Sequence, residues 1–526
     1  MGPRTCRRAA ATGAPNARDA MLIPKRFRDP PEAPNSGLRE SSARIDTLLF
    51  SRQLVFFAGI AVSSLALIFQ CYRYLSSGGY LDHIEGNVVI SGWQYIHGAP
   101  LYEIQDGAPH LATYYGPLAY LVEVPALLLV GATVMASKLT SMLTLLFTVV
   151  IMSRYLIRHS ERKDAHHAIF LLLAGLLLFG PVSFWVRPDP IEILLVAVAV
   201  VSTTSQQRPL WVGICIGLAV NLKVHAFFYF LPILVDMWLI GGCRAILIAA
   251  GSAVVTFILP FLAPGVSLHD YIGELARQVG GRAHTSVELP WTLISLALLF
   301  LPTVVPLAVQ GQPRRTTVYA SATLATAALL VYPATFPGAG YYHFLPLLPV
   351  LVDLRHRLWS KRMVVELTTF VILFVAWLPT QHTLELLSTR QRSNLASEEA
   401  LALARKSPFR PVQVGYGDNL QSYELSQLAK AVLSLNSYPA LFDAQVLMEL
   451  RQIGIDGSPR WIPYLRECRI RRWLLPRGER PFAIVSYFYD HGPVFSEEFR
   501  RAFFDNYKMV ESAENFDVWE CVKRKQ

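Results

Sequence analysis

The stretch GGYLDHIEGNVVISGWQYIHGAPLY, residues 78–102, follows the first long apolar run of the chain and contains Asp82 and Glu85 but no Lys or Arg. The absence of basic residues extends from residue 76 to residue 137. Because loops that stay in the cytoplasm are enriched in Lys and Arg, this interval is predicted to be the first outer loop of a membrane protein.

The composition is that of a polytopic membrane protein. Of 526 residues, 53% are hydrophobic and only 16% are charged. We expect an α-helical membrane protein with about 11 transmembrane helices, each long enough to cross the hydrocarbon core. The expected spans are 53–75, 138–157, 167–186, 189–206, 208–222, 224–241, 245–264, 290–310, 317–335, 341–354 and 363–380.

The basic residues decide the sidedness. The net charge of +10 arises in the N-terminal tail and in short loops, which favours a topological explanation over nucleic-acid binding. The segment 114–132 is ambiguous, but Pro117, Glu123 and Pro125 within it favour a juxtamembrane helix over a twelfth span. This places the N-terminus in the cytoplasm of a multi-pass protein of the cell inner (plasma) membrane.

Three regions are expected from these patterns. Residues 1–47 hold nine Lys or Arg and no lasting hydrophobic period, so we expect a disordered cytoplasmic tail, in which Met21 is an alternative start. Residues 48–380 form the transmembrane core, with the first outer loop at 76–137. Residues 381–526 form an extracytoplasmic mixed α/β domain.

The C-terminal region carries its own signals. PVQVGYGD (411–418), RPFAIVSYFY (480–489) and FDVWECVKR (516–524) are expected to be strands, and DAQVLMELRQIG (443–454) a helix. Cys468 and Cys521 are the only cysteines of this region, so a disulfide can persist there, although two unpaired buried thiols fit the sequence equally.

Asp82 and Glu85 are the first candidates for chemistry. They are three residues apart and would share a helix face at the outer membrane surface. A carboxylate at the edge of a low-dielectric region has its pKa raised toward the range of a general base, which suits proton removal from an alcohol. The alternative is that Asp82 caps a helix HIEGNVVISGWQYI and that Glu85 lies in its first turn.

Charged residues at span ends are the next candidates. Arg187 and Asp189, in FWVRPDPIEILL, are predicted to lie near the outer surface, where Arg187 contacts an anion or anchors the helix by snorkelling. Lys223, with His225 close by, is expected to bind an anion such as a lipid phosphate, or to form an interfacial ion pair.

Later outer segments add further candidates, of which Arg282 and His284 are the weaker. Tyr342 and His343, in TFPGAGYYHFLPLLPVL, can hydrogen-bond phosphate or sugar or can belong to the interfacial aromatic belt. Arg282 and His284 follow a predicted amphipathic helix within residues 267–289.

These features, in this order, resemble the GT-C superfamily of integral-membrane glycosyltransferases, which use polyprenyl-phosphate sugars. The resemblance rests on the acidic pair, HGAPLY, YYGPLAYL, RPDP, the single mid-chain Lys and YYHFLPLLP. It covers residues 50–380 and is closest to the protein mannosyltransferase, lipid A aminoarabinose transferase and polyprenol-dependent bacterial mannosyltransferase groups. It implies that Asp82 is the catalytic base and that Glu85 binds acceptor or metal. A divalent cation is compatible with the superfamily but no ligand cluster is evident.

The sequence therefore predicts a hexosyl- or pentosyltransferase of the cell envelope. It would move a sugar from a polyprenyl-phosphate donor to an acceptor hydroxyl at the extracytoplasmic face, with inversion, and the acceptor would be a glycan, lipid or protein. A ligase or polymerase of polyprenyl-linked glycans is an alternative. A lipid or solute transporter is another, although that class predicts two matching halves and polar residues at mid-membrane.

Overall fold

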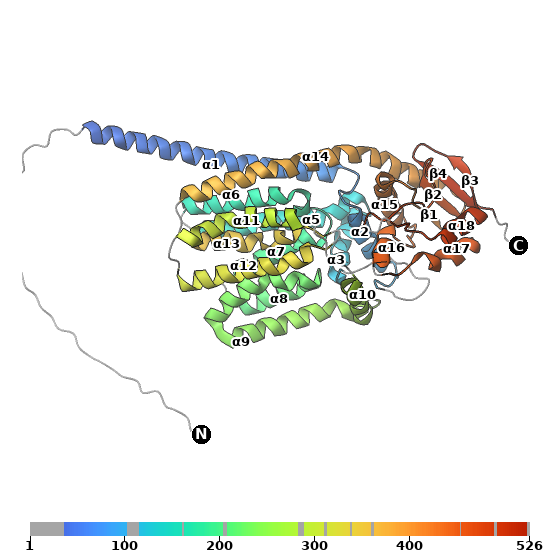
Figure 1. Ribbon diagram of the computed structural model, residues 1–526, viewed down its shortest axis with the longest axis horizontal. Helices are drawn as coiled ribbons and strands as arrows, with labels where there is room; N and C mark the ends of the chain where they lie inside the picture. Colours follow the sequence, from blue (N-terminus) through green and yellow to red (C-terminus); the bar gives the residue numbers. More distant parts are fainter. Residues whose placement is uncertain are drawn as a thin grey trace, which may run out of the picture. The chain divides into compact units, whose positions relative to one another are not determined.

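The structure is a computed structural model of the chain that describes residues 36–102, 115–159, 162–202, 208–281, 289–309, 313–336, 339–358, 362–452, 454–488 and 492–522. Most of these residues are helical, and a small β-sheet lies near the C-terminus (Figure 1). The prediction of an α-helical membrane protein with a C-terminal α/β region is confirmed.

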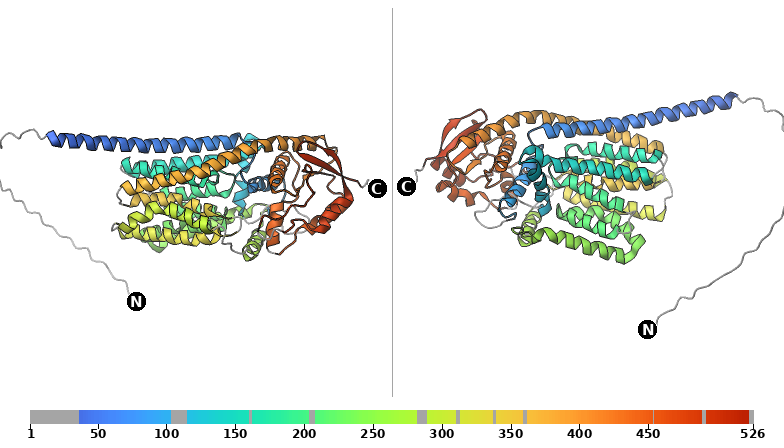
Figure 2. Two further views of the ribbon diagram at one scale, coloured as in Figure 1. Left: turned by 45° about the horizontal axis from the view of Figure 1, so that its top comes forward. Right: turned by 180° about the vertical axis from the view of Figure 1, so that it is seen from behind.

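The helices of the membrane core pack side by side, the first of them from Val55 onward (Figures 1 and 2). They are α1 (Ser36–Ser76), α5 (Val134–His159), α6 (Arg162–Phe179), α7 (Pro188–Val201), α8 (Arg208–Val220), α9 (Leu231–Ile258), α11 (Leu289–Val309), α12 (Arg314–Ala334), α13 (Leu348–Arg357) and α14 (Arg362–Lys406). Within the described residues, six segments are long and apolar enough to cross a membrane: Phe56–Ser76, Val134–His159, Ala165–Ser183, Val224–Leu262, Arg314–Ala334 and Phe370–Lys406.

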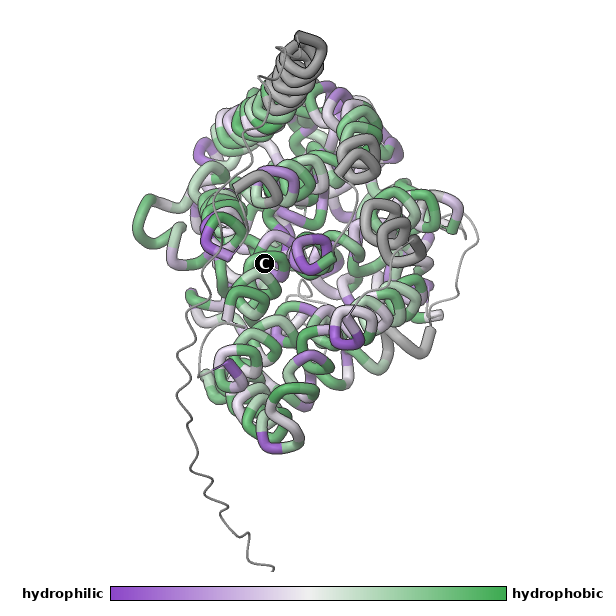
Figure 3. Tube along the Cα trace, turned by 90° about the vertical axis from the view of Figure 1, so that its left-hand side faces the viewer, coloured by the Kyte–Doolittle hydropathy of each residue, from purple (hydrophilic) through white to green (hydrophobic). Residues whose placement is uncertain are grey.

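Figure 3 colours the chain trace by hydropathy and shows that hydrophobic residues recur along these helices, and many of their side chains are exposed. Leu247 and Phe374, for example, are 71% and 81% exposed. Lipid tails solvate such side chains, whereas in water a large apolar surface would promote association. The chain is a multi-pass membrane protein.

Two segments differ in detail from the expected spans. α1 begins at Ser36, so its first turns lie within the expected disordered tail, of which residues 1–35 are outside the described part. Gly242, at φ 61° and ψ −159°, breaks α9 into two arms. The predicted spans 224–241 and 245–264 meet at this break, where a left-handed φ suits Gly.

The ambiguous segment 114–132 forms two short helices, α3 (Pro117–Leu121) and α4 (Val124–Val130), separated at Glu123. At 1.5 Å per residue, fourteen residues from Pro117 to Val130 rise only about 21 Å, which is less than the hydrocarbon thickness. α2 (His83–Ile96) packs beside them. The predicted amphipathic helix is confirmed as α10 (Leu268–Gly281).

Short 3₁₀ helices lie next to several of these spans. They are η1 (Gly180–Ser183), η3 (Val224–Phe230), η4 (Leu259–Leu262) and η5 (Tyr341–Leu347). Two of them, η3 and η5, begin beside predicted site residues.

The C-terminal region is a mixed four-stranded sheet with helices. The strand order is β1 (Val412–Val414), β2 (Arg472–Pro476), β4 (Phe516–Cys521), β3 (Tyr507–Ser512), and only β1 and β2 pair in parallel. The helices are α15 (Leu420–Leu435), α16 (Ala444–Gln452), η6 (Ser458–Trp461), α17 (Ile462–Arg466) and α18 (Glu497–Asn506). Cys468 and Cys521 form a disulfide.

Two expectations for this region need correction. Over its described residues, 480–488, RPFAIVSYFY is not a strand, since Val485 makes an isolated bridge there and Phe482 at φ 55° turns the chain. The second long strand is instead β2, in the sequence RWLLP. α14 also does not end near residue 380 but continues to Lys406, because hydropathy marks where apolar residues stop and not where a helix stops. The expected strands at β1 and β4 and the expected helix α16 are confirmed.

α2 joins the two regions. It packs against α15, where a Cβ at position 86 would be in van der Waals contact with the methyl group of Ala431, at 3.4 Å. Gln94 Nε2 also donates to the carbonyl oxygen of Ala440 at 3.1 Å. α2 is therefore held between the membrane core and the C-terminal region, by contacts near both of its ends.

Candidate functional site

Asp82 is the N-cap of α2. Its Oδ1 accepts a hydrogen bond from the Ile84 amide at 3.4 Å, and Glu85 Oε1 accepts from the Asp82 amide at 2.7 Å, which completes a capping box. The cap hypothesis is thus confirmed, and the helix it starts is the predicted one. Capping uses only Oδ1 of Asp82, so it does not by itself explain what the other carboxylate oxygen, Oδ2, contacts.

The second oxygen of Asp82 is paired with Arg187. Arg187 Nη1 lies 2.6 Å from Asp82 Oδ2, while Nη2 donates to the hydroxyls of Tyr115 at 2.9 Å and Tyr342 at 3.3 Å. The guanidinium also lies 4.1 Å from the ring centroid of Trp185. Arg187 is only 5% exposed and faces this cluster, so the alternative of a snorkelling anchor is wrong.

The electrostatics of Asp82 differ from expectation. Burial raises the pKa of this carboxyl, but the charge and hydrogen bond of His83, whose Nδ1 lies 2.8 Å from Oδ1, together with Arg187, outweigh burial and lower the pKa below its ordinary range. The predicted rise in the pKa of Asp82 is therefore wrong. Burial lowers the pKa of His83, yet Asp82 raises it above its ordinary value.

Lys223 lies at the end of the loop after α8 and is 4% exposed. Its Nζ is 2.5 Å from Asp189 Oδ1 and 3.6 Å from Glu192 Oε2, and Trp185 Nε1 donates to the other oxygen of Asp189 at 3.0 Å. The alternative of a structural ion pair is confirmed. The ammonium group is also 5.6 Å from the ring of Tyr342, so it borders the Arg187 cluster.

The two predicted histidines meet. His343 Nδ1 and His225 Nε2 are 3.0 Å apart, and the ring of Tyr342 stacks on that of His343 with centroids 4.8 Å apart. η3 and η5 bring them together from positions 118 residues apart in the chain. Tyr342 thus contacts both Arg187 and this histidine pair.

Glu85 lies beneath the site and has no exposed surface. One oxygen accepts from the backbone amides of Leu81 and Asp82, and the other accepts from the Val186 amide and the Tyr74 hydroxyl. Burial raises the pKa of Glu85, against the effect of these hydrogen bonds. Through these hydrogen bonds, Glu85 links the backbone next to Asp82 to the backbone next to Arg187. The expected contact of Glu85 with acceptor or metal does not fit this enclosed position.

A divalent cation does not fit the described residues. They include no group of three or more His, Cys, Asp or Glu side chains arranged to hold a metal ion. Both oxygens of Asp82 already face positively charged or hydrogen-donating groups.

Comparison with known proteins places the fold. The model of glycosyltransferase family 87 matches residues 113–333. The crystal structure of ArnT from Cupriavidus metallidurans in the apo state aligns with a TM-score of 0.57 and 13% identity, over 90% of this chain and 98% of that one. The undecaprenyl phosphate-bound structure of the same protein aligns with a TM-score of 0.55 and 13% identity, over 89% and 98%. The fold is that of GT-C glycosyltransferases. No curated protein matches the sequence significantly.

Within this GT-C fold, eight of the predicted residues form one connected cluster, joined by the contacts given above. They are Asp82, Glu85, Arg187, Asp189, Lys223, His225, Tyr342 and His343. Arg282 and His284 lie outside the described residues.

Sequence reasoning missed His83, Tyr115 and Trp185 as site residues. Each stands next to or within a motif that was singled out, and each contacts Asp82 or Arg187. Because aromatic residues are common at membrane interfaces, their presence there carries little signal without the fold.

Proposed function

We propose that this protein is a GT-C glycosyltransferase that moves a sugar from a polyprenyl-phosphate donor to an acceptor hydroxyl at the extracytoplasmic membrane face, with inversion at the anomeric carbon. One observation carries the proposal: a carboxylate and a guanidinium, Asp82 and Arg187, are paired at the centre of a buried cluster of cations and tyrosines. The match to glycosyltransferase family 87 and the fold shared with ArnT support it.

The donor phosphate would bind at Arg187. Its Nη2 contacts the hydroxyls of Tyr115 and Tyr342, so a phosphate oxygen meets one cation and two hydroxyl donors in the same place. The His225 and His343 pair borders this position through Tyr342. The ArnT structure bound to undecaprenyl phosphate supports a lipid phosphate as the ligand class.

Asp82 would act as the base. The acceptor hydroxyl gives its proton to the carboxylate, its oxygen forms a bond to the anomeric carbon, and the bond from that carbon to the phosphate oxygen breaks. The leaving polyprenyl phosphate takes the bonding electrons and gains one negative charge. Arg187 stabilises this developing charge, because a preorganised cation in a dry site acts most strongly where charge appears in the transition state.

Arg187 also links donor binding to the basicity of Asp82. While the ion pair is intact, Asp82 is ionised but is a weak base. A donor phosphate competes for the same guanidinium and loosens its hold on Asp82, which raises the affinity of the carboxylate for a proton. The base would thus be activated only when the donor is present.

The remaining polar residues have supporting parts in this proposal. Asp189 and Glu192 balance the charge of Lys223, so Lys223 exerts a reduced positive potential at the donor site. Arg187 would therefore carry most of the phosphate binding. Glu85 is a positioning residue for both Asp82 and Arg187.

The proposed sidedness follows from charge and from the disulfide. The stretch from 76 to 137 lacks Lys and Arg, which favours the outer side for Asp82. The Cys468–Cys521 disulfide favours an oxidising compartment for the C-terminal region, which contacts His83 and Gln94 of α2. The N-terminus would then lie in the cytoplasm, and the membrane would be the cell inner membrane.

A transfer assay tests the proposal. Membranes containing the full chain are supplied with a panel of labelled polyprenyl-phosphate hexoses and pentoses, and Asp82→Asn is the matched control. Asn is also a good N-cap, so this substitution keeps the start of α2 while it removes the base. We expect transfer of one donor by the unsubstituted protein and none by Asp82→Asn, at equal expression and membrane insertion. Near wild-type transfer by Asp82→Asn would exclude Asp82 as the base.

A further inference from the structure

A cavity of about 750 Å³ opens in the C-terminal region. Its walls come from α14, from the start of α15, and from the chain next to β2 and β4. The polar side chains that line it include Ser393, Asn419, Gln421, Ser422 and Glu424. We call this cavity the α15 groove, and its volume falls in the range of pockets that enclose drug-sized molecules.

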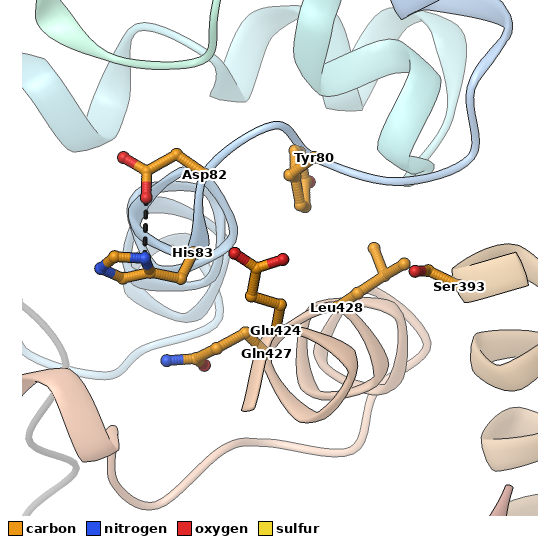
Figure 4. A pocket seen from close by; sticks show the side chains of 7 residues that line it. All are labelled: Tyr80, Asp82, His83, Ser393, Glu424, Gln427 and Leu428. Carbon is orange, nitrogen blue, oxygen red and sulfur yellow. Dashed lines mark ion pairs between the residues drawn. The ribbon is translucent and has the colours of Figure 1, made fainter. Parts of the chain in front are cut away.

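A second, much smaller cavity of about 10 Å³ lies between the α15 groove and the site. Asp82, His83 and Tyr80 line it on the side of α2, and Glu424 and Ser393 line both cavities. Figure 4 shows the Glu424 carboxylate extending from α15 toward the start of α2. A space of this size holds one water-sized group, which is the size of a single hydroxyl.

Asp82 therefore has two different sides. Its Oδ2 faces Arg187 and the proposed donor phosphate, whereas its Oδ1 faces His83, which lines the small cavity. A general base that deprotonates the acceptor while the donor is attacked needs this arrangement, because the acceptor and the donor must reach the site from different sides.

We propose that the α15 groove binds the acceptor, a neutral hydroxyl-rich glycan, and that the small cavity receives the one hydroxyl that is glycosylated. The proposal rests on the function proposed above and names the substrate class of that same site. Carboxylate, amide and hydroxyl side chains are the groups that hydrogen-bond sugar hydroxyls, and the lining supplies all three kinds.

The polar wall of the groove is preorganised. Glu479 Oε2 accepts hydrogen bonds from the amides of Asp418 and Asn419 and from the Ser422 hydroxyl, at 3.0, 3.2 and 2.8 Å. Asn419 in turn caps α15 by accepting from the Gln421 amide at 2.9 Å. These bonds fix the backbone that presents Gln421 and Glu424, so little ordering is needed when a glycan binds.

Binding and transfer are measured separately to test the proposal. The probes are octyl glycosides of neutral mono-, di-, tri- and tetrasaccharides, titrated into the purified full chain. We expect the Kd to fall as the saccharide lengthens, because the groove has room for more than one ring. Glu424→Gln should weaken tetrasaccharide binding by about tenfold through loss of charge-assisted hydrogen bonds. Gln421→Trp, which fills the groove, should abolish saturable binding.

The matched controls lie on α18. Glu497 is exposed and pairs with Arg501 at the surface, so Glu497→Gln makes the same change as Glu424→Gln, and Glu497→Trp introduces the same side chain as Gln421→Trp, both away from the groove. They should leave the Kd unchanged. A Kd that is independent of saccharide length and equal in all variants would overturn the α15 groove as a glycan site.

The transfer assay separates the two proposals. Normal transfer by Gln421→Trp with an active donor overturns the groove and leaves the glycosyltransferase function standing. Groove-dependent binding in a protein that transfers from no donor overturns the proposed function and leaves the groove standing. Loss of both binding and transfer in Gln421→Trp, with both kept in Glu497→Trp, supports the two together.

Discussion

Arg187 and Asp82 are separated by 105 residues in the chain, and their side chains are joined by an ion pair of 2.6 Å. Arg187 uses its other terminal nitrogen for Tyr115 and Tyr342, so one guanidinium connects the carboxylate to the tyrosines. The planar fork of Arg makes this double use possible, whereas the ammonium group of Lys is a point charge.

Arg187→Lys tests this geometry. We expect kcat/KM for transfer to fall by about 10² to 10³, in the range observed when one preorganised donor is removed from an active site. The charge is retained, so membrane insertion and folding should be near normal. Steady-state kinetics with the active donor provide the measurement. Full activity in Arg187→Lys would mean that positive charge alone is required.

Lys223→Ala should act on both stability and donor use. It leaves Asp189 and Glu192 buried without their counterion, which should lower the free energy of unfolding by ~3 to 5 kcal/mol. Thermal unfolding in detergent measures this loss, and the double variant Lys223→Met with Asp189→Asn should recover part of it.

Donor binding by Lys223→Ala is then compared at a temperature where the variant is folded. We expect Lys223→Ala to weaken donor binding more than Asp82→Asn does, because Lys223 borders the Arg187 cluster through Tyr342. Unchanged donor affinity would remove Lys223 from the donor site and leave only its structural ion pairs.

Glu85→Gln tests the positioning role. The amide has a single oxygen, so two of the four donors that face Glu85 would meet an NH₂ group instead. We expect a loss of about 2 to 3 kcal/mol in unfolding free energy. We also expect kcat to fall with little change in the donor KM, since both substrates still bind while Asp82 and Arg187 lose alignment. A change confined to the acceptor KM would instead favour direct acceptor contact by Glu85.

The pH dependence of transfer reports on the Asp82–His83 pair. Because His83 and Arg187 lower the pKa of Asp82, the base form persists as the pH falls below the ordinary value of 3.8. His83→Gln removes part of this lowering, so the acid limb of the pH profile should move to higher pH. An acid limb that stays in place would exclude Asp82 as the group that controls it.

The same pair makes a prediction for stability. The folded pKa of His83 is raised above its ordinary value of 6.5. Its contribution to stability is therefore fully present below pH 6.5 and is lost as the pH rises through the folded pKa. The difference in unfolding temperature between the unsubstituted protein and His83→Gln should shrink over that interval.

Much of the site was predictable because its charged residues stand at the ends of apolar runs. Asp82, Arg187 and Lys223 cost free energy beside a bilayer, so each attracts notice in the sequence. Their pairing was not predictable, since the partner of each comes from a distant segment. The pKa of Asp82 was predicted in the wrong direction because burial can be expected from the sequence, whereas the contacts of Asp82 with the neighbouring His83 and the distant Arg187 are set by the fold.

The fold divides in a similar way. The apolar period and the prolines predicted the helical core and the short helices α3 and α4. In the C-terminal region, β-rich composition predicted a strand at RPFAIVSYFY, where Phe482 takes a left-handed φ and turns the chain. Local composition does not reveal such a turn, and hydropathy does not reveal that α14 continues beyond its apolar residues to Lys406.

His83 Nε2 lies 3.0 Å from the hydroxyl of Tyr487, a residue 404 positions later in the chain. The surroundings of the proposed base are therefore completed by a segment that is translated well after the apolar helices. A chain that is truncated after its spans would lack this contact between Tyr487 and His83. The proposed transfer would then depend on the C-terminal region as well as on the spans that surround Arg187.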